Sequence, residues 1–97
     1  MQKLISDNYQ SIVDRGLISP TTTLFEFLDK LDEEVEELKY SSFDYSDYDS
    51  QKFNNVKEEL ADVIMVCLNM AKHYDIDIEK EIKNKIKINK QRAKNGK

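Results

Sequence analysis

Apolar residues recur at spacings of three and four along most of this chain, which is the period of one face of an α-helix. The clearest stripe is formed by Leu24, Phe27, Leu28, Leu31, Val35 and Leu38. The chain has only two glycines and one proline, so few positions interrupt a helix. We see no segment with the alternating pattern of a β-strand. The sequence therefore predicts one all-α domain over residues 1–97.

Local signals divide the chain into four helices. Helical spacing over residues 2–14 predicts the first, and Gly16 and Pro20 interrupt the pattern after it. Thr23 and Glu26 have the spacing of a capping box, which predicts a second helix through about residue 39. The serine- and aspartate-rich segment 40–50 predicts a loop, and the third helix is expected from 52–55 to about 74. Asp77 is a suitable N-cap for a fourth helix over 78–93.

The third helix is expected to be apolar nearly all round over residues 63–71. One neighbouring helix cannot cover such a circumference, so we expect a second copy of the chain to cover the rest. The predicted fold is an antiparallel four-helix-type bundle completed by homodimerisation, as a homodimer or a tetramer formed as a dimer of dimers. Cys67 is expected in this core, and His73 at the surface or the subunit interface.

Charge is distributed unevenly along the chain. Residues 83–97 hold six lysines, one arginine and no acid, whereas the other 82 residues carry a net charge of −11. No apolar run approaches the roughly 18 residues of a membrane span, and the first ten residues lack the apolar middle of a signal peptide. A lone cysteine fits a reducing compartment. We therefore expect a cytoplasmic protein that does not enter membranes.

Two pairs of acids border the apolar stripes of the second and third helices. Glu34 and Glu37 are three residues apart, as are Glu59 and Asp62, so each pair shares one helix face. If the two helices are antiparallel neighbours, all four carboxylates converge at their seam. Like charges about 4 Å apart repel by roughly 4 kcal/mol at an effective dielectric near 20, so the cluster needs protons or a cation. An all-oxygen site favours Mg²⁺, with Mn²⁺ second. The alternative is that each pair is simply a solvated helix surface.

The acidic segments resemble those of the MazG-type nucleotide pyrophosphohydrolases, which belong to the all-α NTP pyrophosphatase superfamily. The family pattern is E-E-x-x-E, a variable gap, then E-x-x-D. It matches EEVEE at 33–37 and ELAD at 59–62. The basic segment KIKINKQR also resembles the last helix of this family through Lys85, Asn89 and Arg92.

The resemblance implies an enzyme that hydrolyses a nucleoside triphosphate between the α and β phosphates, giving a nucleoside monophosphate and pyrophosphate. It implies that Glu34, Glu37, Glu59 and Asp62 bind Mg²⁺. Glu33 matches the remaining family acid, which orients or deprotonates the attacking water, so Glu33 and Glu34 are the catalytic candidates.

Other polar residues are candidates for substrate binding. Lys85 and Arg92 are seven residues apart on one helix face, with Asn89 between them, so the three can grip phosphates. The alternative is a basic helix end that complements the helix dipole. Asn69 follows Asp62 by seven residues and can contact the base or sugar, or hydrogen-bond across a dimer seam. Aromatic residues of the loop, Tyr40, Phe43, Tyr45 and Tyr48, are either a lid over the base or incidental.

Several alternatives stay open at this point. A phosphoribosyl-ATP pyrophosphohydrolase has similar acidic motifs, and all-α dUTPases and dCTPases differ in pocket shape, which one sequence does not reveal. A different class is a helical module without enzymatic activity that binds protein or nucleic acid through the basic tail. Nucleic acid is the less favoured partner because the rest of the chain is acidic.

Overall fold

The computed structural model describes residues 2–43 and 50–96, and for 42, 43 and 50–54 it describes the backbone only. It contains four helices, α1 (Gln2–Asp14), α2 (Leu24–Phe43), α3 (Ser50–His73) and α4 (Ile78–Lys94), and no strand among the described residues. The predicted all-α class is confirmed. The helices begin and end within a few residues of the predicted positions, apart from the loop between α2 and α3.

The predicted loop over residues 40–50 is too long. Helix α2 continues to Phe43 and α3 already begins at Ser50, while residues 44–49 lie outside the described chain. The Ser41 hydroxyl donates a 2.8 Å hydrogen bond to the Leu38 carbonyl oxygen. This bond lets a serine remain in the last turn of a helix, although serine more often favours turns.

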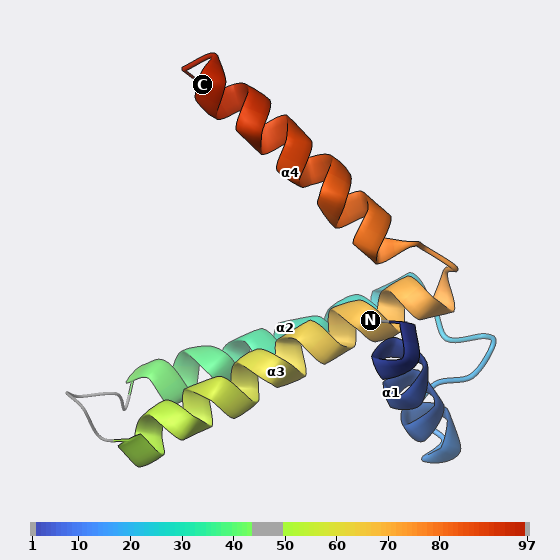
Figure 1. Cartoon of the computed structure of the whole chain (residues 1–97). Helices are drawn as coiled ribbons and strands as arrows, with labels where there is room; N and C mark the ends of the chain where they lie inside the picture. Colours follow the sequence, from blue (N-terminus) through green and yellow to red (C-terminus); the bar gives the residue numbers. More distant parts are fainter. Residues whose placement is uncertain (1, 44–49, 97) are drawn as a thin grey trace.

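Helices α2 and α3 lie side by side and antiparallel, and α1 packs across α3 (Figure 1). The buried apolar side chains come from these three helices and the segment between α1 and α2; they are Ile5, Ile18, Phe27, Val66, Leu68 and Ala71. Thr23 caps α2 as predicted. Its hydroxyl accepts from the Glu26 amide at 3.2 Å, and Glu26 accepts from the Thr23 amide at 3.0 Å. Such a cap contributes about 1 kcal/mol to helix stability.

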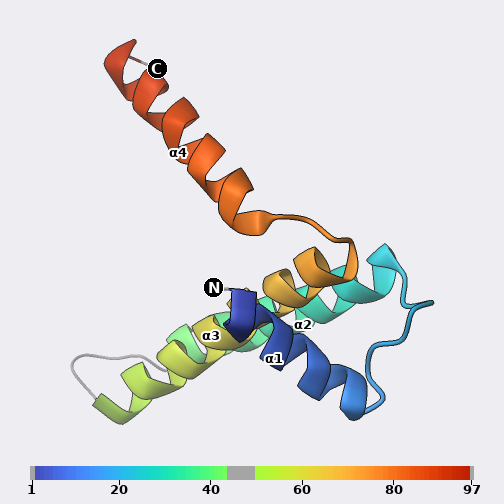
Figure 2. The same cartoon turned by 45° about the vertical axis from the view of Figure 1, so that its right-hand side comes forward.

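Helix α4 extends away from the other three helices, as two views show (Figures 1 and 2). None of its described residues is buried. The expected four-helix-type bundle is therefore not closed within one chain. The cause lies in the preceding turn, where Asp75 has φ 54° and the Ile76 amide donates to the Ala71 carbonyl at 2.8 Å. This Schellman-type ending stops α3 and leads the chain away from the bundle. Homodimerisation stays a prediction.

His73 connects α3 to both α1 and the segment before α2. Its Nε2 lies 2.9 Å from the Thr22 carbonyl oxygen, and its Nδ1 lies 3.0 Å from the Tyr9 hydroxyl. A carbonyl only accepts, so Nε2 donates and the neutral ring accepts from Tyr9 at Nδ1. The ring also packs on Phe27, with centroids 4.9 Å apart. These partners half-bury the imidazole inside one chain, so His73 is not a freely exposed surface residue. Its expected place at a subunit interface stays a prediction.

Only part of the apolar circumference of α3 is covered. Val66, Leu68 and Ala71 are buried, whereas Leu60 and Ile64 are about half exposed. Cys67 is exposed as well, so its expected core position is wrong in the single chain. It shares the open face of α3 with Leu60 and Ile64, since the three are spaced by four and three residues. No helix among the described residues is long and apolar enough to cross a membrane.

Candidate metal and nucleotide site

Three acids from α2 and α3 meet at the seam between the helices. Glu34, Glu59 and Asp62 each offer a carboxylate oxygen, and the three oxygens lie within 4.8 Å of one another. The antiparallel pairing causes this convergence, because it places the middle of α2, which carries Glu34, beside the middle of α3, which carries Glu59 and Asp62. The structure therefore brings together three of the four predicted metal ligands.

Two oxygens of this cluster have no partner. Oε2 of Glu34 and Oε2 of Glu59 are buried and accept no hydrogen bond within the described chain. An unsatisfied buried polar atom costs about 1–3 kcal/mol, and more when the group is charged. Glu34 itself is only 8 % exposed although it is a carboxylate. Buried carboxylate oxygens without donors, on acids that cluster together, fit a bound cation.

Glu37, the fourth predicted ligand, lies at the exposed edge of the cluster. The charge of Glu34 raises the pKa of Glu37, and desolvation and the neighbouring Glu59 carboxyl raise this pKa further. The raised pKa is the expected result of several acids at one place without a cation. Glu37 therefore belongs to the same electrostatic group, although it is not among the three acids whose oxygens meet.

Lys30 supplies the cluster with its one observed positive partner among the described residues. Its Nζ lies 3.1 Å from Glu34 Oε1 and 3.4 Å from Glu33 Oε2. The hydrogen bond to Glu34 raises the pKa of Lys30. Glu33, the predicted water-activating acid, is exposed and lies outside the three-acid cluster. Sequence reasoning missed Lys30, although its place four residues before Glu34 was a usable signal for an ion pair.

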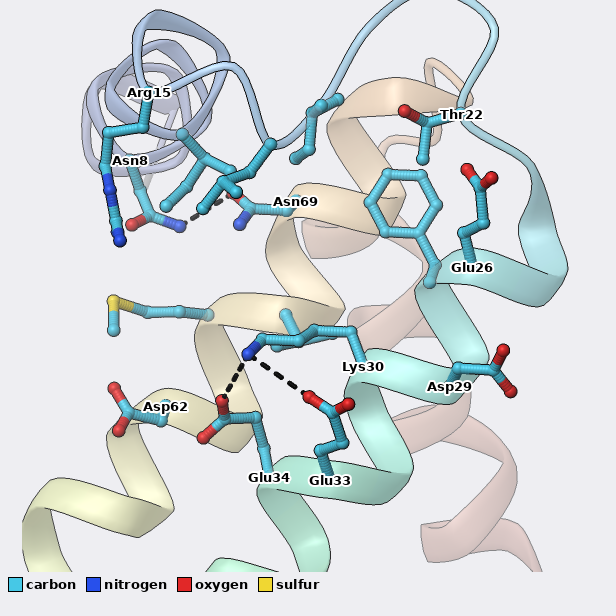
Figure 3. Close-up of a pocket in the computed structure, with 16 residues that line it drawn as sticks. Asn8, Arg15, Thr22, Glu26, Asp29, Lys30, Glu33, Glu34, Asp62 and Asn69 are labelled. Atoms are coloured by element: carbon cyan, nitrogen blue, oxygen red, sulfur yellow. Dashed lines mark hydrogen bonds and ion pairs between the residues drawn. The ribbon is translucent and has the colours of Figure 1, made fainter.

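A cleft of about 750 Å³ opens beside the acids (Figure 3). Its walls come from α1, the segment between α1 and α2, and the facing sides of α2 and α3. Pockets that bind small molecules and cofactors commonly measure about 300–1,000 Å³. Glu33, Glu34 and Asp62 line the same cleft as Asn69, so carboxylates and an amide share one cavity.

Asn69 is 7 % exposed and faces this cleft. Its Oδ1 accepts a 2.7 Å hydrogen bond from Nδ2 of Asn8 on α1. Asn69 and Asp62 line the same cavity, as their spacing of seven residues predicted. Within the single chain, the Asn69 amide oxygen is bonded to Asn8. The alternative, a hydrogen bond from Asn69 across a dimer seam, stays a prediction.

A family model described as "MazG-like family" matches residues 25–97, about three quarters of the chain. The chain belongs to the MazG-like family. The match contains α2, α3 and α4 and both acidic motifs, so the resemblance seen in the motifs is confirmed. Neither the curated proteins nor the solved structures contain a match.

The basic helix of this MazG-like chain does not reach the cleft. Lys85, Asn89 and Arg92 lie on α4 and are exposed, and no described residue of α4 lines the cavity. The predicted phosphate grip is therefore not formed within one chain. Tyr40 is 67 % exposed, while the side chains of Phe43, Tyr45 and Tyr48 lie outside the described residues.

Helix α1 of the MazG-like chain lies before residue 25, outside the matched segment, yet it forms one wall of the cleft through Asn8 and Ile12, together with Arg15 just after its end. Sequence reasoning missed Asn8 and Arg15. No local pattern marks them, because Asn8 and Asn69 are 61 positions apart in the sequence and meet only through the packing of α1 on α3.

Proposed function

We propose that this chain is a Mg²⁺-dependent nucleoside triphosphate pyrophosphohydrolase, which cleaves the bond between the α and β phosphates. The observation that carries this proposal is the pair of unpartnered buried oxygens, Glu34 Oε2 and Glu59 Oε2, beside a cleft of nucleotide size. Membership of the MazG-like family supports the same reaction class. The products are a nucleoside monophosphate and pyrophosphate.

The acids fit a hard divalent cation. Glu34, Glu59 and Asp62 would hold Mg²⁺, with Glu37 as the fourth ligand at the exposed edge. The donor set is oxygen only, which suits Mg²⁺ first and Mn²⁺ second. When bound, Mg²⁺ offsets the charge of the phosphate oxygens and activates water for attack.

Lys30 and Glu33 have complementary roles at the edge of the cluster. The Lys30 ammonium group already lies between two carboxylates at 3.1 and 3.4 Å, so it is placed to donate to a phosphate oxygen near Glu34. Glu33 is solvent-accessible and lines the cleft, which suits a group that accepts a proton from attacking water. Asn69 contacts the base or sugar at the far end of the same cleft.

A second copy of the chain supplies the phosphate-binding residues of α4. In the proposed homodimer, the apolar stripe Ile78, Ile82 and Ile86 of α4 packs against the partner chain. Ile82 and Ile86 are about half exposed in the single chain. The partner's acidic surface attracts the +7 charge of residues 83–97. Lys85, Asn89 and Arg92 then reach the cleft of the neighbouring copy and bind phosphates there.

Release of pyrophosphate from a panel of ribo- and deoxynucleoside triphosphates tests the proposal. We expect Mg²⁺-dependent release that stops in EDTA. Glu59→Gln and Asp62→Asn should each lower kcat/KM by at least about 100-fold while the helical circular dichroism signal is kept. Glu58→Gln is the matched control, because Glu58 precedes Glu59 on α3 and lies outside the cluster. Near-full activity of either cluster variant would overturn the assignment.

The same panel separates the related activities. Preferential turnover of phosphoribosyl-ATP would identify the histidine-pathway enzyme, and strong preference for dUTP or dCTP would identify the corresponding pyrimidine enzyme. The exposed, basic α4 also fits a nucleic-acid-binding module. That function predicts salt-sensitive binding of DNA or RNA without release of pyrophosphate.

A further inference from the structure

The end of the cleft away from the acids is formed by two amides. Asn8 on α1 donates to Asn69 on α3 at 2.7 Å, and both side chains line the cavity (Figure 3). An amide carries two N–H donors and one carbonyl acceptor, so a single bond between two amides leaves most of their capacity unused. Within the described chain, Nδ2 of Asn69 and Oδ1 of Asn8 have no hydrogen-bond partner.

Both residues that carry this unused capacity line the cleft. Asn69 is more than nine-tenths buried, but its unpartnered Nδ2 atom is not fully enclosed. A molecule in the cleft can therefore reach this donor. A pair whose only role is to fasten α1 to α3 does not need to leave an N–H donor open to a cavity, so this donor is available to a ligand.

The cavity has three zones in the order of the parts of a nucleotide. Glu33, Glu34, Asp62 and Lys30 lie at one end, and the amide pair lies at the other end beside Arg15. Between Asp62 and Asn69, helix α3 contributes the apolar side chains of Met65 and Val66 to the lining. Asp62 and Asn69 are seven residues apart on α3, which corresponds to about 10 Å along the helix. A nucleoside monophosphate spans a similar length from its phosphate to the far edge of its base.

We propose that Asn8, held by Asn69, is a specificity-determining residue that hydrogen-bonds the polar edge of the nucleobase. The inference rests on the proposed function for the phosphate end of the cleft and adds the base end. Asn69 presents an N–H donor and Asn8 a carbonyl acceptor, so the ligand is a heterocycle with an acceptor beside a donor. Because Asn8 precedes residue 25, half of this base-binding pair comes from outside the segment that the family model matches.

Binding of nucleoside monophosphates tests the inference without turnover. Isothermal titration calorimetry with dUMP, dCMP and pyrophosphate, each with Mg²⁺, compares the wild type with Asn8→Ala and Asn8→Asp. Uracil and cytosine have nearly the same shape, but their edges carry opposite donor and acceptor patterns. Pyrophosphate has no base and reports on the phosphate end alone.

We expect Asn8→Ala to weaken both monophosphates by about tenfold and to leave pyrophosphate binding unchanged. Asn8→Asp keeps the bond to α3, because Asn69 Nδ2 can donate to the new carboxylate, but it presents only acceptors to the base. It should therefore shift the ratio of the two dissociation constants about tenfold toward dCMP, because position 4 of the base is an amino donor in cytosine and a carbonyl acceptor in uracil. Gln10→Ala is the control, since Gln10 bonds Asp14 at 2.8 Å on the exposed side of α1.

Two results with the variants would overturn the inference. One is a dUMP-to-dCMP ratio that changes by less than about twofold in Asn8→Asp. The other is loss of pyrophosphate binding equal to the loss of monophosphate binding in Asn8→Ala, which would indicate a purely structural amide pair. Failure of the wild type to bind either monophosphate would also overturn it. Failure of the wild type to release pyrophosphate from triphosphates would instead reject the proposed function. The ratio of the two dissociation constants is measured without turnover, so it tests the base contact separately.

Discussion

The Lys30 ammonium nitrogen lies 3.1 Å from Oε1 of Glu34, a carboxylate that is almost fully buried at the seam of α2 and α3. The second Glu34 oxygen, Oε2, has no partner among the described residues. One buried acid therefore has an internal cation on one oxygen and an open position on the other. This arrangement leads to opposite expectations for metal binding and for substrate turnover.

Replacement of Lys30 by glutamine should separate these two functions. Removal of the positive charge strengthens Mg²⁺ binding to the neighbouring carboxylates, by about two- to tenfold for a half-exposed lysine. The same change removes a phosphate donor, so kcat/KM for triphosphates should fall by about tenfold or more. Titration calorimetry with Mg²⁺ alone and steady-state kinetics measure the two effects, with Lys3→Gln on α1 as control. Parallel loss of metal affinity and activity would show that Lys30 only supports the fold.

Addition of Mg²⁺ should raise the melting temperature of the wild type. The cation binds the folded acid cluster and not the unfolded chain, so at one hundred times Kd it adds about 2.7 kcal/mol to the free energy of unfolding. Glu59→Gln removes one of the unpartnered oxygens, so the metal-free variant should melt higher than the metal-free wild type, and Mg²⁺ should add little.

Differential scanning fluorimetry with Mg²⁺ and with EDTA checks this expectation. Glu58→Gln, which leaves the cluster intact, should keep the full Mg²⁺ response. An equal response of Glu59→Gln and the wild type would mean that the cation binds elsewhere.

The pH dependence of stability follows from Glu37. Its pKa in the folded chain is raised above the ordinary value of 4.5, chiefly by the charge of Glu34. The folded state therefore holds this proton more tightly than the unfolded state does. The free energy of unfolding is greatest below pH 4.5 for this group, and it falls as the pH rises through the higher folded pKa.

In EDTA, the melting temperature should thus decline from mildly acidic toward neutral pH by more in the wild type than in Glu37→Gln. A series of thermal melts across this pH range measures the difference. Excess Mg²⁺ should weaken the decline, because the cation stabilises the ionised cluster. Identical pH profiles for the wild type and Glu37→Gln would contradict the role given to the Glu34 charge.

The acid cluster could be predicted from the sequence, whereas the surroundings of the cluster could not. Spacing of three residues within each pair and the expected antiparallel helices sufficed to place Glu34, Glu59 and Asp62 together. The spacing within each pair is a local pattern, and the two helices that carry the pairs follow each other in the chain. The hydrogen bond between Asn8 and Asn69 depends instead on how α1 crosses α3, which no short-range pattern encodes.

The direction of α4 also escaped sequence reasoning. Asp77 caps α4 as predicted, and its side chain accepts from the Lys80 amide at 3.1 Å. However, a turn residue does not fix where the next helix leads, and the φ of 54° at Asp75 was not evident from its identity. A stripe of isoleucines predicts that α4 is covered, but not by which chain.

Mixing two inactive variants tests whether α4 acts on the site of a second copy. Glu59→Gln retains an intact α4, and Arg92→Ala retains intact acids. In a mixed dimer whose sites are shared, one site combines wild-type acids with a wild-type α4, so about a quarter of the wild-type activity should return. Pyrophosphate release after co-refolding measures this recovery, and each variant alone is the baseline. If mixed dimers form but pyrophosphate release does not recover, α4 acts on the cleft of its own chain or on no cleft.

The most direct measurement of the central claim is ³¹P NMR of a nucleoside triphosphate incubated with the protein and Mg²⁺. The account predicts that the triphosphate signals are replaced by those of a monophosphate and pyrophosphate, and that EDTA or Glu59→Gln prevents the change. Appearance of a diphosphate and orthophosphate, or an unchanged spectrum across the full panel of triphosphates, would contradict it.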